Sequence, residues 1–253
     1  MKNTTPLGVK TSMKMKTLAS LLAVSLLSLA VARAADTAVI SGKVTLKGTP
    51  PPEVPIAQIN GNPDCKANHP QIPNTKRYVV GANGELANCF VYVKDGLGER
   101  VFPPAAKAVV LDQSKCFYVP YVVGVQVGQD FEIRNSDSFM HNVHILAQVN
   151  KEENIAQPVK GSKNVKQFTK PEIMIKFMCN VHPWMFAYIG VVSHPFFAVT
   201  DEKGEFKLSG LPAGDYTIEV WHAKAGTQTV KVKVADGGTG KADFTLNVPE
   251  EKK

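Results

Sequence analysis

The stretch FMCNVHPWM, residues 177–185, contains three side chains that could bind a metal, spaced C-x2-H-x2-M. They are Cys179, His182 and Met185. Thiolate and thioether sulfur are soft ligands, and imidazole suits copper, zinc, iron and nickel. Alternation along the preceding strand-like run puts Cys179 on an apolar face, and Pro183 cannot continue a central strand. We therefore expect a short loop that turns His182 and Met185 back toward the thiolate.

A histidine far upstream supplies a fourth donor. In FMHNVHILA, residues 139–147, alternation places His141 on the face of the core residues. His144 falls on the other face and is the weaker candidate. Two imidazoles and a thiolate with a weak axial thioether are the donor set of a blue-copper electron-transfer site. The sequence thus predicts one mononuclear type 1 copper site, with the ligands His141, Cys179, His182 and Met185.

Other readings of these residues stay open at this stage. Cys179 and His182 alone could be half of a zinc site, although no close second pair of donors accompanies them. Cys179 could instead be half of a disulfide, with Met185 as core packing. The loop has no second cysteine for a binuclear copper site, and the chain has no His-x-His pair of the multicopper kind. For these reasons we do not expect an enzyme.

The segment from Ala108 to Ser193 resembles the cupredoxins, amicyanin and plastocyanin most closely. The VGQDFEIRNSD strand, the HNV stretch that begins at His141 and the C-x2-H-x2-M spacing are the residues concerned. The resemblance implies copper-ligand roles for the four donors. It also implies that Asn142 braces the loop that holds Cys179. The lysine-rich stretch 148–170, expected to be a loop, departs from this family and leaves the partner surface open.

The stretch GEFKLSGLPAGDYTIEVWHA, residues 204–223, resembles the carboxypeptidase regulatory-like, or transthyretin-like, β-domain. Strand-like runs near the N-terminus resemble the opening strands of the same kind of domain. We expect both ends of the chain to form one sandwich with the cupredoxin inserted, or else a tandem order. The predicted fold is all-β, a cupredoxin Greek-key β-sandwich plus a prealbumin-like β-sandwich. The expected segments are 1–34 (signal peptide), 35–107 (N-terminal β segment), 108–193 (cupredoxin) and 194–250 (regulatory-like segment).

The first 34 residues have the pattern of a signal peptide, with a basic start, a short apolar stretch and the small-x-small sequence Ala32-Arg33-Ala34. They contain five basic residues and no acid. The remaining chain has 24 basic against 22 acidic residues, a net charge of +2 in place of +7. Nucleic-acid binding is therefore not expected. We expect an exported protein, periplasmic or secreted, with no membrane span in the mature chain.

Export also bears on the cysteines, because disulfides persist in oxidising compartments. If Cys179 is a ligand, at most two of the other three can pair within the chain. Cys116 lies in a strand beside an aromatic pair, and Cys65 lies in a long loop (60–75) that needs tethering. We predict a Cys65–Cys116 disulfide, with Cys89 as a buried free thiol.

The leading function is single-electron transfer with a redox protein partner. Trp184 and Pro183 are expected to face solvent beside His182 as a docking patch, rimmed by lysines 151, 160, 163, 166 and 170. In the competing hypothesis Trp184 packs between the two sandwiches. Copper storage or delivery, and a structural or adhesion role with a relict site, are the alternative functions.

Overall fold

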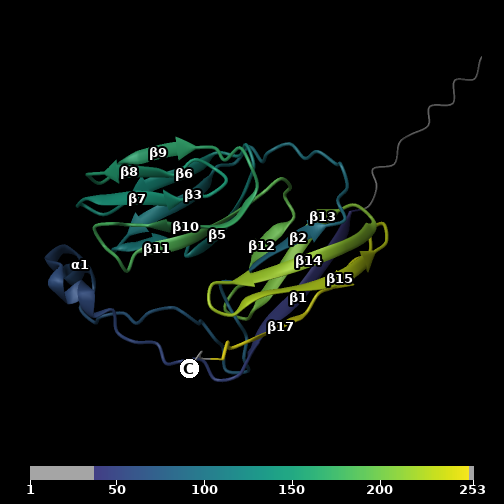
Figure 1. The fold of residues 1–253 in the computed structure, drawn as a ribbon, viewed down its shortest axis with the longest axis horizontal. Coiled ribbons are helices and arrows are strands. Elements are labelled where there is room, and N and C mark those ends of the chain that lie inside the picture. The colour runs from purple at the N-terminus through teal and green to yellow at the C-terminus, as the bar shows by residue number, and fades with distance from the viewer. Residues whose placement is uncertain (1–36, 251–253) are drawn as a thin grey trace, which may run out of the picture. The chain divides into compact units, whose positions relative to one another are not determined.

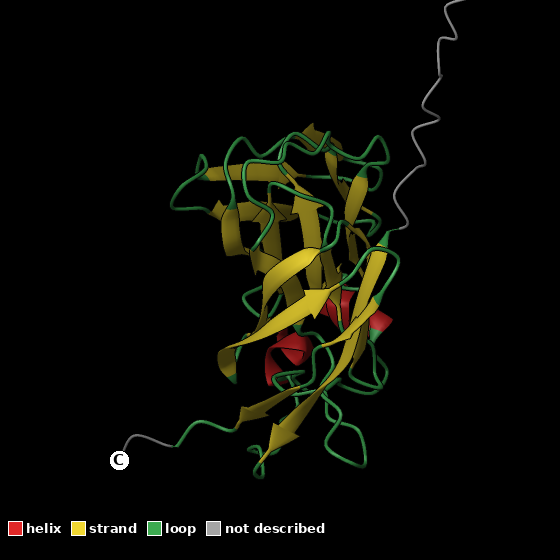
Figure 2. Cartoon of the chain, turned by 90° about the vertical axis from the view of Figure 1, so that its right-hand side faces the viewer, coloured by secondary structure: helices red, strands yellow, loops and turns green. Residues whose placement is uncertain are grey.

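Strands are the main elements of the chain in the computed structural model, which describes residues 37–250 (Figure 2). In β6 (Phe131–Asn135), for example, Phe131 and Ile133 are buried, and Glu132 between them is half-exposed. This alternation is what a sheet with one face on a core requires. The predicted all-β class with β-sandwich architecture is confirmed. Helical turns among the described residues are limited to η1 (Ala57–Gly61) and α1 (Pro63–Asn68).

One sandwich is formed by the middle of the chain. Its first sheet has the order β5-β11-β10-β7-β8 and its second the order β4-β3-β6-β9. Their core contains Phe131, Phe168 and Phe177 together with Cys179 and Met185. Besides β6, these strands are β3 (Val109–Ser114), β4 (Phe117–Val119), β5 (Val122–Gln126), β7 (His141–Leu146), β8 (Glu153–Gln157), β9 (Lys163–Lys166), β10 (Glu172–Met178) and β11 (Phe186–Val192).

The other sandwich combines strands from both ends of the chain. One sheet has β1 between β13 and β16, with β17 also paired to β1, and the other has the order β12-β2-β14-β15. In Figure 1 the purple β1 lies beside the yellow β17, with which it pairs in parallel. These strands are β1 (Ala38–Lys47), β2 (Phe90–Asp95), β12 (Phe197–Val199), β13 (Glu205–Leu211), β14 (Gly214–His222), β15 (Gly226–Val234), β16 (Thr239–Lys241) and β17 (Phe244–Asn247). Strands β3 to β11 thus lie, in sequence, between two segments that share sheets.

A small cluster joins strands of both sandwiches. It contains Phe90 and Tyr92 of β2, Val122 of β5 and Val192 of β11. Gly124 lets the aromatic rings approach, because a Cβ there would lie 2.3 Å from the ring of Phe197. The two sandwiches therefore meet through packed aromatic side chains.

Two segments differ from the sequence expectation. The stretch 148–170, expected as a loop, contains β8 and β9. Strand β9 pairs with β6 and lies at a sheet edge, where lysines are common. Because its sequence is rich in lysine, it did not have the apolar pattern of a strand. The loop 60–75 contains α1, which begins with Asn62 as N-cap and Pro63 at its first turn, a usual start signal.

The predicted signal peptide lies outside the described residues. Within residues 37–250 no helix is long and apolar enough to cross a membrane.

Candidate metal centre

The loop between β10 and β11 brings three of the predicted ligands into the core. The backbone N–H of Cys179 donates to the carbonyl of Met185 at 3.0 Å, and that of Met185 donates to the carbonyl of His182 at 2.8 Å. These bonds close a tight turn and bury all three side chains, each exposed by 1% or less. The loop therefore forms the tight turn that Pro183 and the C-x2-H-x2-M spacing predicted.

The donor atoms of three predicted ligands converge. Nδ1 of His141 lies 2.9 Å from Nδ1 of His182. Sγ of Cys179 lies 3.6 Å from Nδ1 of His182 and 4.0 Å from Nδ1 of His141. The three residues thus form a buried group whose ligand atoms lie within 4.8 Å of one another. Met185 is fully buried in the core cluster that contains Cys179.

His141 is oriented by a carboxylate. Its Nε2 lies 2.9 Å from Oδ2 of Asp137, a buried residue four positions earlier in the chain. Asp137 is itself fixed, because it accepts the backbone N–H groups of Lys115 and Cys116 at 2.7 and 2.8 Å. A histidine whose second nitrogen donates to a carboxylate presents the first as a lone pair, which is how ligand histidines are commonly held.

His182 is held by a residue from the N-terminal part of the chain. Its Nε2 lies 3.0 Å from Nδ2 of Asn62, the N-cap of α1. The side-chain oxygen of Asn62 accepts the backbone N–H of Cys65 at 3.0 Å. One amide therefore links the helix start to the metal-site imidazole, 120 residues away in sequence.

Asn142 contacts the loop that it was expected to brace. Its Oδ1 accepts the backbone N–H of Asn180 at 2.8 Å and lies 3.4 Å from Sγ of Cys179. Its amide nitrogen donates to Oδ1 of Asn154 in β8 at 2.6 Å. Asn142 thus ties β8 to the residue that follows Cys179.

The electrostatics favour a thiolate at Cys179. Burial acts to raise the pKa of this thiol, but hydrogen bonds from His141 and His182 outweigh it and lower the pKa from 9.0 to about 6. The pKa of His141 is raised: burial lowers it, and the hydrogen bonds to Asp137 and Cys179 more than compensate. Because the thiolate is the form that binds metals, the site fits a soft or borderline ion. Cys89, the other free cysteine among the described residues, is buried with a pKa of about 12 caused by desolvation.

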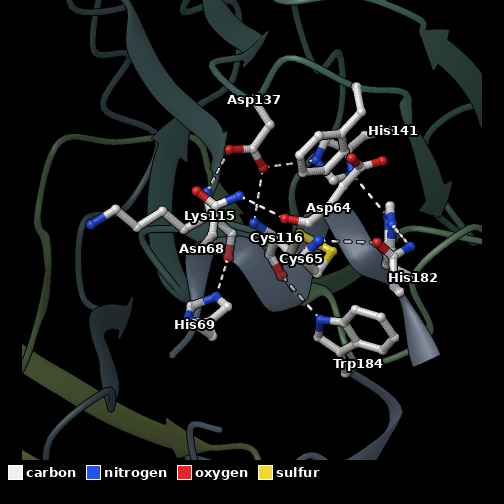
Figure 3. The surroundings of a disulfide bond; sticks show 12 residues. Asp64, Cys65, Asn68, His69, Lys115, Cys116, Asp137, His141, His182 and Trp184 are labelled. Carbon is white, nitrogen blue, oxygen red and sulfur yellow. Dashed lines mark hydrogen bonds and ion pairs between the residues drawn. A yellow bond between two sulfur atoms is a disulfide. The ribbon is translucent and has the colours of Figure 1, made fainter. Parts of the chain in front are cut away.

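A disulfide lies beside this group. The pair predicted from the sequence, Cys65 and Cys116, is bonded in the structure, and one of its sulfur atoms lies within 4.8 Å of a ring nitrogen of His182 (Figure 3). Helix α1 carries both Asn62 at its cap and Cys65 in its first turn. The segment η1–α1 is therefore attached once to His182, through Asn62, and once to Cys116, through the disulfide, and His182 is only 1% exposed.

Trp184 does not face solvent freely, in contrast to the predicted docking patch. Its side chain is half-buried, its Nε1 donates to the carbonyl of Cys116 at 3.2 Å, and its ring lies 5.3 Å from that of His182. These contacts lie within the middle sandwich, against whose core Trp184 packs. Pro183 is exposed, as is Val181 at 44%.

Three of the five lysines expected to rim that patch form ion pairs. Lys151 and Lys166 pair with Glu153, and Lys163 pairs with Glu132. His144 contacts Asn180 and Glu152 and lies outside the converging group, in agreement with its weaker rank.

Sequence reasoning missed three residues of the site: Asp137, Asn62 and Phe139. The spacing of Asp137 and His141 is a usable signal for a carboxylate–histidine pair. Phe139 is half-buried, and its ring lies 5.2 Å from His141 and 6.1 Å from His182. Nothing local in the sequence signals its contact with His182, nor that of Asn62.

Comparisons with known proteins returned two kinds of domain. The family model of the carboxypeptidase regulatory-like domain matches residues 187–247, beginning inside β11. A search of curated proteins found no match.

A search of solved structures returned copper proteins. The copper-containing nitrite reductase from Thermus scotoductus SA-01 is 24% identical with a TM-score of 0.29, and the match covers 38% of this chain and 24% of that one. A methionine-to-alanine mutant of amicyanin in its Cu(I) form is 25% identical with a TM-score of 0.30, covering 40% and 97%. A reduced tryptophan-to-tyrosine mutant of amicyanin is 26% identical with a TM-score of 0.30, covering 40% and 97%.

Proposed function

We propose that this chain is an exported carrier of single electrons, in which His141, Cys179 and His182 would hold one type 1 copper and Met185 would be a fourth, weaker ligand. The observation behind the proposal is the convergence of two Nδ1 atoms and one thiolate in a buried group. The second nitrogen of each imidazole has its own fixed partner, Asp137 or Asn62. Imidazole rings fixed in this way suit a permanent metal site.

The donor set favours copper over zinc. A structural zinc site uses four strong ligands, commonly cysteine and histidine, whereas two histidines, one cysteine and a buried methionine suit copper. Bound copper would supply a one-electron redox change. The chain would hold the ligands in place through the turn that closes at Met185 and through Asn142, so that little rearrangement accompanies each electron.

Burial supports a carrier in preference to an enzyme. His141, Cys179, His182 and Met185 are each exposed by 1% or less, so the side chains leave no open position for a substrate. Catalytic metal sites keep such a position. Export to the periplasm, and a redox protein as partner, belong to the same proposal. The exposed loop residues Val181 and Pro183, on either side of His182, are the proposed contact.

Copper storage or delivery is the alternative. It would use extra methionines as soft donors, and Met140, beside His141, is 48% exposed. Met174, however, packs against the cluster that joins the two sandwiches. The carrier is therefore the better-supported function, and a structural role would need no metal at all.

The proposal can be tested by copper loading and voltammetry of the purified protein. We expect one copper per chain and a reversible one-electron wave. Cys179→Ser should abolish the wave, while Cys89→Ser, which changes the other buried free cysteine, should retain it. Tight binding of Cu(I) without a reversible wave would favour copper handling. Absence of binding would support the structural role.

A further inference from the structure

A large cleft lies beside the metal-site loop and has no part in the proposed electron carrier. Its volume is about 1080 Å³. Aromatic side chains from β4, from the segment that follows it and from β10–β11 form much of its wall. These are Phe117, Tyr118, Tyr121, Trp184, Phe186 and Tyr188.

The charged residues of the cleft are all of one sign. Its lining contains five cations and no aspartate or glutamate: Lys76, Arg77, Lys115, Lys176 and Lys224. Among the described residues, none of the five forms an ion pair with a carboxylate, unlike the lysines of β8 and β9. Nζ of Lys176 lies 5.1 Å from the ring centre of Phe186, so charge and aromatic wall are directly adjacent.

One acidic residue close to the cleft, Glu53, is hydrogen-bonded to backbone groups and not to the cationic side chains. Glu53 contributes, after burial, to the raised pKa of Tyr121, so it is close to the cleft. Its oxygens accept the backbone N–H groups of Arg77 at 3.0 Å and Tyr78 at 2.7 Å, as well as the hydroxyl of Thr75. It is thus engaged with the backbone, and the cationic side chains remain available to a ligand.

We propose that this cleft binds a small aromatic anion, a planar ring system that carries a carboxylate, sulfonate or phenolate. Aromatic walls provide stacking surfaces, and unpaired lysine and arginine provide charge-assisted hydrogen bonds. The volume matches the ~300–1,000 Å³ of small-molecule sites, whereas protein partners mostly use flatter surfaces of ~800 Å². The net charge of +2 outside residues 1–34 makes five unopposed cations in one cleft a local feature and not a general property of the surface.

The cleft also touches the metal centre. Trp184, one wall residue, lies 5.3 Å from the ring of His182. Tyr118, another, donates its hydroxyl hydrogen to the carbonyl of Asn142 at 2.7 Å. A bound anion would therefore lie against two residues that contact the site. The binding proposal itself rests on the cleft alone and does not require copper.

Calorimetric titration of the purified protein with 2-naphthoate tests the proposal, with the uncharged 2-naphthamide as a matched ligand. We expect one 2-naphthoate per chain and much weaker binding of 2-naphthamide. The double variant Arg77→Gln/Lys176→Gln should weaken naphthoate binding by at least about tenfold, the loss of one or more hydrogen bonds to a charged group. Lys203→Gln/Lys207→Gln, which removes two exposed lysines outside the cleft, should leave it unchanged.

Several outcomes would overturn the proposal. They are equal affinity for the two ligands, unchanged binding by the Arg77→Gln/Lys176→Gln variant and no naphthoate binding at all. Binding of an acidic aromatic peptide but not of naphthoate would assign the cleft to a protein partner. The titration is performed with and without copper, so a failure here is separate from a failure of the carrier proposal.

Discussion

At the scale of single residues, one chain of hydrogen bonds connects four side chains of the site. With both imidazoles neutral, Nδ2 of Asn62 donates to Nε2 of His182, and Nδ1–H of His182 donates to Nδ1 of His141. Nε2–H of His141 then donates to Asp137. A ligand nitrogen must carry no proton. In this neutral state His141 meets the condition at Nδ1. When His141 is protonated, as its raised pKa favours, Nδ1 also donates to Cys179 and must lose that proton on metal binding. In either state the proton of His182 must move from Nδ1 to Nε2, where Asn62 would have to present its oxygen.

Asn62→Asp should therefore strengthen copper binding. A carboxylate can accept both the backbone N–H of Cys65 and the Nε2–H of His182, which fixes the tautomer that metal binding needs. We expect affinity to rise by about 10–100-fold, the usual scale for partners of ligand histidines. Competitive copper titration measures the affinity, and imidazole nitrogen NMR reports the tautomer.

Asn68→Asp is the matched control, since it adds the same charge to α1 at a side chain that contacts Asp64 and not His182. If Asn68→Asp strengthens binding as much as Asn62→Asp, the effect is one of charge alone. If Asn62→Asp binds copper no more tightly than the wild type, the tautomer argument is wrong.

The two free thiols should titrate far apart in the metal-free protein. Hydrogen bonds from His141 and His182, acting against burial, hold the pKa of Cys179 at about 6, while burial raises that of Cys89 to about 12. Ultraviolet absorbance of the thiolate should therefore rise in one step near pH 6, a step that Cys179→Ser removes. Because this pKa lies below the ordinary 9.0, ionisation of Cys179 stabilises the fold. The contribution is complete above about pH 9 and is lost as the pH falls through about 6. A first step above pH 8 would contradict this view of the site.

At the scale of elements, the segment η1–α1 covers the metal-site loop. It contributes Asn62 to His182. Its Cys65 is joined to Cys116, the residue whose carbonyl accepts the indole N–H of Trp184 (Figure 3). Such attachment explains why His182 is buried although it lies in a loop with exposed neighbours. The disulfide fixes an element that few residues of its own could hold in place.

Removing the disulfide should destabilise the protein and uncover His182. The two cysteines are 51 residues apart, and closure of such a loop contributes about 4 kcal/mol on the chain-entropy model. We expect Cys65→Ser/Cys116→Ser to lose stability of that order in urea denaturation. We also expect faster modification of His182 by diethyl pyrocarbonate in the metal-free protein. Cys89→Ser, which leaves the disulfide intact, is the control. Unchanged modification of His182 would show that the segment stays in place without the bond.

At the scale of the whole molecule, the two ends of the chain together form one sandwich, and the middle of the chain forms the other. The sheets of the first depend on β1 and β2 as well as on β12 to β17, so neither end can complete it alone. Gly124 and Gly190 lie where the sandwiches meet, and a Cβ at Gly190 would lie 2.5 Å from the ring of Phe90. Contact between the sandwiches is thus part of the packing of both.

Gly124→Ala should lower the melting temperature, because the added methyl group collides with Phe197 and Phe90. Overpacking of this kind costs about 1–3 kcal/mol. Thermal unfolding followed by circular dichroism measures the loss, and the ligand residues should keep their copper affinity. Gly61→Ala is the control, since its added Cβ meets nothing within 4 Å. Equal melting temperatures for the two variants would mean that the contact is loose.

The sequence was most informative where the argument was local. Period-two alternation identified the all-β class, and it placed His141 and Cys179 on core-facing positions. The spacing of Cys179, His182 and Met185 predicted a tight loop. Contacts between distant segments could not be predicted in this way: Asn62 reaches His182 only because α1 folds over the loop. The hydrogen bond from Trp184 to the carbonyl of Cys116 could not be predicted either, because the acceptor lies 68 residues away.

The visible absorption spectrum of the copper(II)-loaded protein tests the central claim most directly. If the Cys179 thiolate binds the copper together with His141 and His182, the protein should show an intense thiolate-to-copper band. Cys179→Ser should lose the band, and Met185→Leu should keep it while the reduction potential shifts. A protein that binds copper(II) without this band, or a Cys179→Ser variant that keeps it, would contradict the account.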